Sequence, residues 1–199
     1  LDESGVPSPR VDAEILVAHV LGVSRSEVYS ADDQLSEEEL RRLDSAQERR
    51  RLREPLAYIL GEWGFRRLTL RVDRRVLVPR PETEVLVERC LEHLGALSEP
   101  RVLDVGVGSG AIALAIADEH PGARILAVDR SADALAAARE NVARVPIDGR
   151  IDFRQGDLLA GISGPFDLVV SNPPYVSPED FDTLEPEVRI FEPRDAIVG

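Results

Sequence analysis

The run Asn172-Pro173-Pro174-Tyr175 places a hydrogen-bonding side chain beside two consecutive prolines. A residue before proline is disfavoured in the helical region, and each proline ring fixes its own φ, so this turn has little freedom to lose on binding. Because prolines lack an N–H group, the turn presents carbonyl acceptors, and the side-chain oxygen of Asn172 adds another. Two acceptors in a rigid turn suit a planar –NH₂ group with two hydrogens to donate, and Tyr175 offers a flat face for packing on it.

An amide or aryl amine nitrogen is a poor nucleophile because its lone pair is delocalised. Accepting both of its hydrogens favours a localised lone pair, so catalysis of group transfer to this nitrogen is mostly orientation, worth about 7–11 kcal/mol at best. Such a transfer needs no catalytic histidine or lysine. The composition agrees with a reaction that uses no lysine, since all 24 basic residues are arginine. This composition excludes a phosphate-loop lysine and a Schiff-base lysine.

A glycine-rich loop, Gly106-Val107-Gly108-Ser109-Gly110, follows the short apolar segment 101–105. Three interpretations stay open: a tight strand-to-helix turn, a dinucleotide site, because Ala111 completes a G-x-G-x-x-A pattern, or an S-adenosylmethionine site. Asp129, about two dozen residues further on, is placed for the ribose hydroxyls of a nucleoside cofactor. Asp104 fits poorly against a pyrophosphate but suits the ammonium group of a methionine, which moderately favours S-adenosylmethionine.

The segments that must position these motifs alternate between helix and strand from about residue 82. We predict helices at 83–94, at 110–119 and from Ser131 to about 143, and strands at 101–105, 124–129, 150–154 and 166–171. This alternation predicts an α/β fold with a parallel sheet and helices on both of its faces. Ligands of such sheets bind beyond the carboxyl ends of the strands, so we expect the glycine loop and the Asn172 turn to face one crevice.

Residues 1–62 have a helical pattern instead. The first predicted helix begins at Ser8-Pro9 and ends at Gly22. The second begins at a capping box of Ser36 with Glu39 and ends at about Arg53. The arginines at the end of this second helix have two interpretations. They complement the helix dipole and aid solubility, or they form a contact surface for an acidic or RNA-containing partner.

Alternating apolar residues at 63–78 predict a strand pair that joins the two regions, with Asp73 near its turn. Cys90 lies on the apolar side of the 83–94 helix, and we expect a packed rather than a reactive thiol.

The composition excludes several classes of protein. With 37 acidic and 24 basic residues the formal charge is −13, which makes the chain a poor generic binder of nucleic-acid backbone. One cysteine and three scattered histidines predict neither a disulfide framework nor a metal site. The sequence shows no signal peptide and no apolar run of about 20 residues, so we expect a cytoplasmic protein.

Three further segments carry a resemblance to a known family. They are Glu54–Gly61, Val76–Glu84 and Asp104–Gly110. The Asn-Pro-Pro-Tyr turn is shared by methyltransferases of planar amines, including those that methylate adenine in DNA. Together the segments resemble the HemK family, protein-(glutamine-N(5)) methyltransferases of class-1 peptide chain release factors. The resemblance runs from about Ser8 to Gly199, and Pro-Arg-Pro-Glu-Thr-Glu is its most discriminating run.

The resemblance implies a class I, Rossmann-like S-adenosylmethionine-dependent methyltransferase. It implies a helical substrate-docking domain at 1–62, a β-hairpin linker at 63–81 and the methyltransferase domain at 82–199. The acceptor would be the glutamine of a Gly-Gly-Gln tripeptide in the release factor, and S-adenosylhomocysteine would be the product. Partners other than the release factor, such as a membrane or nucleic acid, are not expected.

By the same resemblance, the loop from Gly106 to Gly110, together with Asp104, would hold the methionine end of the cofactor. Asp129 would hold the ribose, and Asp157 and Leu158 would lie beside the adenine. Leu158 stands where the family often has an aromatic residue, which weakens a stacking contact there. The acceptor glutamine would meet Asn172, Pro173, Pro174 and Tyr175, of which Asn172, Pro173 and Tyr175 would be catalytic and Asn172 would also border the cofactor.

A class I sheet has further strands after the Asn-Pro-Pro-Tyr strand, so we expect this chain to be part of a longer protein with an incomplete sheet. Two alternatives to glutamine methylation stay open. One is an amino-methyltransferase of adenine or another nucleobase, against which the 17 acidic residues and 9 arginines of residues 101–199 argue. The other is a cofactor- or partner-binding fragment without turnover.

Overall fold

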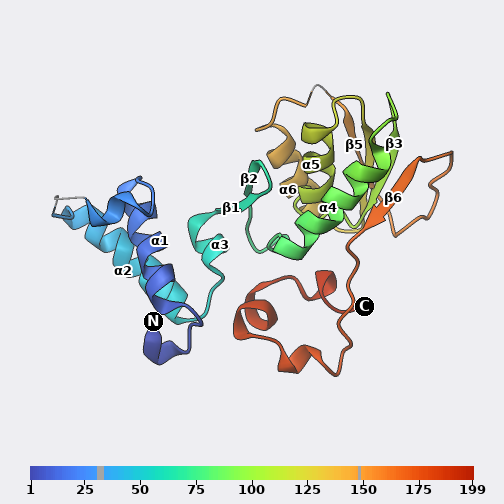
Figure 1. Ribbon diagram of the computed structural model, residues 1–199. Helices are drawn as coiled ribbons and strands as arrows, with labels where there is room; N and C mark the ends of the chain where they lie inside the picture. Colours follow the sequence, from blue (N-terminus) through green and yellow to red (C-terminus); the bar gives the residue numbers. More distant parts are fainter. Residues whose placement is uncertain (31–33, 148) are drawn as a thin grey trace. The chain divides into compact units, whose positions relative to one another are not determined.

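The computed structural model describes residues 1–30, 34–147 and 149–199 (Figure 1). The chain forms two compact units. The helical unit comprises Leu1–Gly61 and Leu184–Phe191. The sheet unit comprises Glu62–Thr183 and Glu192–Gly199. The segment 184–191 thus packs with the first unit, although it follows most of the second in sequence.

The helical unit is built on α1 (Pro9–Leu21) and α2 (Glu37–Arg51), followed by the short α3 (Leu56–Leu60). Helix α1 begins at a proline and ends before Gly22, whose φ of 68° is left-handed, as the sequence predicts. The predicted capping box of α2 is confirmed: the Glu39 N–H donates to Ser36 Oγ at 3.3 Å, and the Ser36 N–H donates to Glu39 Oε2 at 2.8 Å. Short 3-10 helices lie at Asp2–Ser4, Glu27–Tyr29 and, in the later segments of the chain, at Phe181–Thr183 and Arg194–Ala196, with a π-helix at Glu187–Phe191.

A buried ionic network holds this unit together. Arg50 is 5% exposed, and it donates from Nε to Asp12 Oδ2 at 2.7 Å and from a terminal nitrogen to Glu187 Oε1 at 2.8 Å. Arg53 donates to the same Glu187 and, at 2.9 Å, to Glu185. Burial opposes ionisation of Glu187, but the hydrogen bonds from Arg53 and Arg50 hold its pKa below the ordinary value. Both arginines are therefore internal structural groups, a role that neither sequence interpretation anticipated.

The sheet unit contains a four-stranded parallel sheet in the order β5-β4-β3-β6. Its strands are β3 (Arg101–Val105), β4 (Arg124–Asp129), β5 (Ile151–Gln155) and β6 (Leu168–Ser171). Its helices are α4 (Pro81–Leu94), α5 (Ala111–Glu119) and α6 (Ala132–Val142). The predicted α/β fold with a parallel sheet is confirmed.

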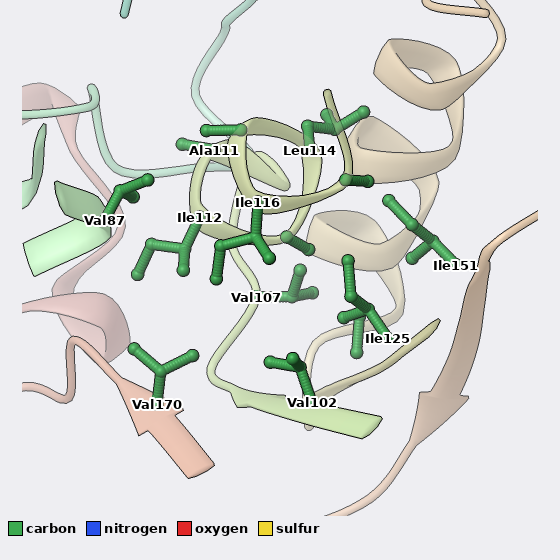
Figure 2. Packing of buried hydrophobic residues seen from close by; sticks show 14 of the residues in the cluster. Val87, Val102, Val107, Ala111, Ile112, Leu114, Ile116, Ile125, Ile151 and Val170 are labelled. Carbon is green, nitrogen blue, oxygen red and sulfur yellow. The ribbon is translucent and has the colours of Figure 1, made fainter. Parts of the chain in front are cut away.

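The core of this unit lies between the sheet and its helices. Every residue of α5 from Ala111 to Ala117 is buried. Figure 2 shows Ile112 and Ile116 pointing toward Val102 and Val170 of the sheet. Residues of α4 and α6 belong to the same apolar cluster, so all three helices pack on one face.

The prediction of helices on both faces is wrong for the described part of the chain. The opposite face, with Leu103, Val105 and Val128, packs against Ile162 and Phe166 from the connection between β5 and β6. The crossovers from β3 to β4 and from β4 to β5 step in the same direction across the sheet. Right-handed crossovers that step in one direction place their helices on the same face, and the connection that steps back to β6 contains no helix in this structure.

The predicted strand pair is present as β1 (Glu62–Phe65) and β2 (Leu68–Arg71), which pair antiparallel. Its turn lies at residues 66–67, where Arg66 has a φ of 52°, so the placement of Asp73 near the turn is wrong. Asp73 follows β2 and accepts hydrogen bonds from the backbone and side chain of Arg75. The apolar alternation continues beyond β2, and no glycine marks the left-handed position, so the pattern alone misplaced the turn.

Cys90 is buried, as predicted, and burial raises the pKa of its thiol. Among the residues described, no helix is long and apolar enough to cross a membrane.

Candidate active site

The structure brings the two sequence motifs to the same edge of the sheet. Strands β3 and β6 are parallel neighbours in which Val105 pairs with Ser171. The glycine loop leaves β3 after Val105, and the Asn-Pro-Pro-Tyr turn leaves β6 after Ser171. Ser171 Oγ donates to the Val105 carbonyl at 2.7 Å, which ties the two exits together. The expected common crevice is thus consistent with the observed register.

Three glycines of the loop adopt left-handed backbone conformations, with φ values of 81° at Gly106, 53° at Gly108 and 85° at Gly110. Apart from its chain neighbours, a Cβ at Gly106 or Gly108 would meet no atom of the described residues within 4 Å, so these positions border open space. A Cβ at Gly110 would lie 3.0 Å from Leu114 and 3.4 Å from Ala138. The first two glycines therefore leave room for a ligand, and the third allows α5 and α6 to pack closely.

Asp129 connects the glycine loop to the start of α6. Its Oδ2 accepts from the Gly108 N–H at 2.9 Å, and its Oδ1 accepts from the Ser131 N–H, also at 2.9 Å. The carboxylate is partly exposed, and each oxygen has a second lone pair. Asp129 can thus hold the loop in place and still accept from a pair of hydroxyl groups.

Asp104 lies at the end of β3 with no exposed surface. Its Oδ2 accepts from the Ala113 N–H at 3.1 Å, whereas its Oδ1 has no hydrogen-bond partner in the part of the chain that the structure describes. Burial is the main cause that raises the pKa of Asp104 to about 7; the Ala113 hydrogen bond opposes this rise, and the nearby charge of Asp129 contributes to it. A buried carboxyl with a spare oxygen fits a cationic ligand at the loop, since a positive charge would compensate it.

The segment Gly156-Asp157-Leu158 follows β5 and reaches the same edge, because the Gly156 N–H donates to the Asp129 carbonyl at 3.0 Å. Leu158 is 64% exposed and has a φ of 48°. A left-handed conformation costs a non-glycine residue about 1–2 kcal/mol. Backbone strain of this kind is often found at ligand sites, and the sequence contained no sign of it.

The Asn172 side chain is oriented by α4. Its amide nitrogen donates to Thr83 Oγ1 at 3.4 Å, which leaves the amide oxygen on the other side of the group. Thr83 is 9% exposed and lies in the first turn of α4. The prediction did not assign Thr83 a role, although it lies in the discriminating Pro-Arg-Pro-Glu-Thr-Glu run.

The rest of the turn is accessible. Both proline bonds of the Asn172-Pro173-Pro174 sequence are trans. Pro173 is exposed and Tyr175 is 83% exposed, so the ring has an open face. Acceptor oxygens and an exposed aromatic ring therefore stand together at the carboxyl edge of the sheet.

Two family models match the chain. The model described as PrmC N-terminal domain matches residues 1–61, and the model described as Methyltransferase small domain matches residues 82–188, more than half of the chain.

Curated relatives match over almost the full chain. A release factor glutamine methyltransferase of Caulobacter vibrioides is 45% identical over 100% of this chain and 70% of its own length. That of Deinococcus radiodurans is 49% identical over 95% of this chain and 68% of its own. The human MTRF1L release factor glutamine methyltransferase is 38% identical over 100% of this chain and 63% of its own.

Among solved structures, the hMettl16 catalytic domain in complex with MAT2A 3'UTR hairpin 6 superposes with a TM-score of 0.55. The match covers 82% of this chain and 58% of that chain at 14% identity. At this identity the likeness shows the fold alone.

Proposed function

This chain belongs to the release factor glutamine methyltransferase family, and from that premise we propose that it methylates the side-chain amide nitrogen of the glutamine in the Gly-Gly-Gln tripeptide of class-1 peptide chain release factors. The resemblance inferred from the sequence is confirmed. The observation that carries the proposal is the identity with these curated relatives over nearly the whole chain, a span that contains both motifs of the site.

As a member of this methyltransferase family, the enzyme depends on S-adenosylmethionine. When bound, this cofactor supplies a methyl group on a positively charged sulfur. In our proposal, the loop of Gly106, Val107, Gly108, Ser109 and Gly110 would hold its methionine end. The open space at Gly106 and Gly108 and the spare oxygen of Asp104 support this assignment. Asp129 would accept from the ribose hydroxyls, and Asp157 and Leu158 would border the adenine.

The chain's own contribution to the reaction is the orientation of the acceptor amide. The Asn172 side-chain oxygen and the Pro173 carbonyl would each accept one hydrogen of the glutamine –NH₂ group. Thr83 would hold the Asn172 amide in the orientation that turns its oxygen away from α4. Pro174 would keep the backbone rigid, and Tyr175 would pack on the amide plane. No side chain needs to remove a proton before the transfer.

The direct test is transfer of a labelled methyl group from S-adenosylmethionine to a purified release factor. We expect labelling of the wild-type factor and none of a variant in which the tripeptide glutamine is alanine. Undiminished labelling of that variant would overturn the proposal. Parallel reactions with DNA and RNA test the nucleobase alternative, and calorimetry with the cofactor separates a binding protein without turnover from an enzyme.

Asn172→Ala tests the role of the turn. We expect kcat to fall about 10²–10³-fold, by analogy with loss of one group from a preorganised polar site, and the Kd for cofactor to change less than about threefold. Ser98→Ala is the control because it removes an exposed polar side chain from the loop between α4 and β3, and its kcat should stay at the wild-type value. A large loss of cofactor affinity with unchanged kcat would contradict the role of Asn172.

A further inference from the structure

Residues 192–199 return to the Asn-Pro-Pro-Tyr turn and pair with the residue that follows it. The Val176 N–H donates to the Ile197 carbonyl at 3.1 Å, and the Gly199 N–H donates to the Val176 carbonyl at 3.2 Å. These bonds form a parallel bridge between Val176 and Val198. Figure 1 shows the carboxyl end of the chain beside the segment that leaves β6.

Gly199 lies directly against the backbone of the turn. A Cβ at this position would be 2.4 Å from the Pro174 carbonyl oxygen and 3.0 Å from the Pro174 carbonyl carbon. Real Cβ atoms essentially never approach another atom within 3.0 Å. Any larger residue would therefore displace either the turn or the segment that supports it.

The other end of residues 192–199 is fixed to the segment before α4. The Glu192 side chain is 1% exposed. Its Oε2 accepts from the Val78 N–H at 3.1 Å, and its Oε1 pairs with the guanidinium group of Arg80. Arg80 is the N-cap of α4, whose Thr83 contacts Asn172.

An aromatic contact adds to this attachment. The guanidinium group of Arg194 lies 4.4 Å from the centroid of the Phe181 ring, which is 5% exposed. Phe181 belongs to the same connection that begins with the turn. Residues 192–199 therefore contact the turn, the connection after it and the segment that leads into α4.

We propose that residues 192–199 position the acceptor oxygens of the turn, with Gly199 and Glu192 as positioning residues for methyl transfer. The inference rests on the proposed function, because it assigns a role in that reaction. The turn follows an edge strand of the described sheet, so β6 supports it from one side only. Displacement of a reacting group by about 1 Å can reduce a rate by about 10²-fold, and a Cβ at Gly199 calls for a shift of that order.

Gly199→Ala is the first test, made in the whole encoded protein. We expect kcat to fall about 10- to 100-fold, the Kd for S-adenosylmethionine to stay within twofold and the thermal midpoint to change little. Gly64→Ala is the matched control. Gly64 is exposed, and among the residues that the structure describes a Cβ there would meet only its chain neighbours within 4 Å, so the kcat of this variant should stay at the wild-type value.

Glu192→Gln is the second test. In glutamine an –NH₂ group replaces one carboxylate oxygen, and this group donates, so it cannot accept from Val78 or Arg80 as that oxygen does. We expect a smaller loss of kcat, again without loss of cofactor affinity. Glu92→Gln, which alters an exposed ion pair with Arg89, should leave kcat unchanged.

Hydrogen exchange gives a readout that does not depend on activity. Both variants should speed exchange of the Val176 amide, whose partner is the Ile197 carbonyl, relative to wild type. Absence of methylation by the wild type would overturn the proposed function, and exchange would still decide whether the segment supports the turn. The inference fails if exchange at Val176 is unchanged in both variants. It also fails if the wild type is active and kcat falls less than twofold in both variants. A fall of cofactor affinity and thermal midpoint in proportion to kcat would contradict it as well.

Discussion

The helical unit and the sheet unit each contain a deeply buried charged residue, and the two residues differ in how far they are paired. In the helical unit, Arg50 is enclosed between the carboxylates of Asp12 and Glu187, and each charge has a partner. In the sheet unit, Asp104 lies two residues before Gly106 in the sequence, and one of its oxygens has no partner in the described chain. A buried charge that is paired is a structural element, whereas one that is left unpaired at a ligand site is a group for a ligand to compensate.

A neutral polar group in the sheet unit sharpens this contrast. Asn141 is 1% exposed, yet both its amide nitrogen and its amide oxygen form hydrogen bonds. Its Nδ2 donates to the carbonyls of Arg71 and Ser109, at 3.0 and 2.9 Å, and its Oδ1 accepts from the Arg71 N–H at 2.7 Å. Burial in this unit is therefore compatible with complete hydrogen bonding, so the spare oxygen of Asp104 is a specific feature of its position.

The largest expected effect comes from breaking the paired network. Arg50→Met leaves Asp12 without its buried partner and removes one of the two partners of Glu187. Loss of one member of a buried ion pair costs about 3–5 kcal/mol, which we expect in urea unfolding. Hydrogen exchange should accelerate in α1 and α2 and stay unchanged in β3 and β4.

The control for this variant is Arg51→Met. Arg51 pairs with Glu48 on the exposed side of α2, where an ion pair contributes about 0–1 kcal/mol. If both variants lowered the free energy of unfolding equally, burial would not distinguish the Arg50 network from an exposed ion pair. That result would contradict the comparison between the units.

The second-largest expected effect concerns the carboxyl group of Asp104. Because burial raises the pKa of Asp104 to about 7, the folded chain keeps a proton that the unfolded chain releases near pH 4. The raised pKa of Asp104 therefore stabilises the folded chain fully below about pH 4. This contribution to the free energy of unfolding is at most about 4 kcal/mol, and it is lost as the pH rises through 7. Without cofactor, wild type should lose stability relative to Asp104→Asn between pH 5 and pH 8, as measured by urea unfolding.

The exposed Asp152 provides the control, and Asp152→Asn should follow the pH dependence of wild type. Saturating cofactor should reduce the pH dependence of the wild type, because a cationic ligand stabilises the ionised carboxyl. Parallel stability curves for wild type and Asp104→Asn would contradict the account of Asp104.

The smallest expected effect comes from shortening an apolar side chain in the core of the sheet unit. Ile116→Val removes one methylene from a fully buried side chain of α5. Such a change costs about 0.5–1.5 kcal/mol, and we expect the urea midpoint to fall without a change of slope or of salt dependence. Val85→Ala, on the exposed side of α4, should shift the midpoint less.

Local patterns predicted the elements well because the signals are themselves local. The strands at 101–105 and 124–129 match the predictions to the residue, and Pro9, Gly22 and Ser36 mark the helix ends as expected. These signals rest on apolar runs and backbone preferences that a few neighbouring residues determine.

Contacts between distant residues could not be predicted in the same way. Arg50 and Glu187 are 137 positions apart, and Thr83 and Asn172 are 89 apart. A charged residue near a helix end has the same local sequence whether it pairs inside the protein or faces solvent. The motifs therefore identified the residues of the candidate site, but the groups that orient them became visible only in the folded chain.

The polypeptide passes between the two units at residues 61–62, 183–184 and 191–192. An accessory domain that is joined by one linker can be lost or exchanged by a single truncation or fusion. A truncation that begins at Glu62 would retain residues 184–191 but remove Arg50 and Arg53, the partners of Glu187. The helical unit is thus not a detachable module, and a chimera that exchanges it between relatives should carry residues 184–191 from the same parent.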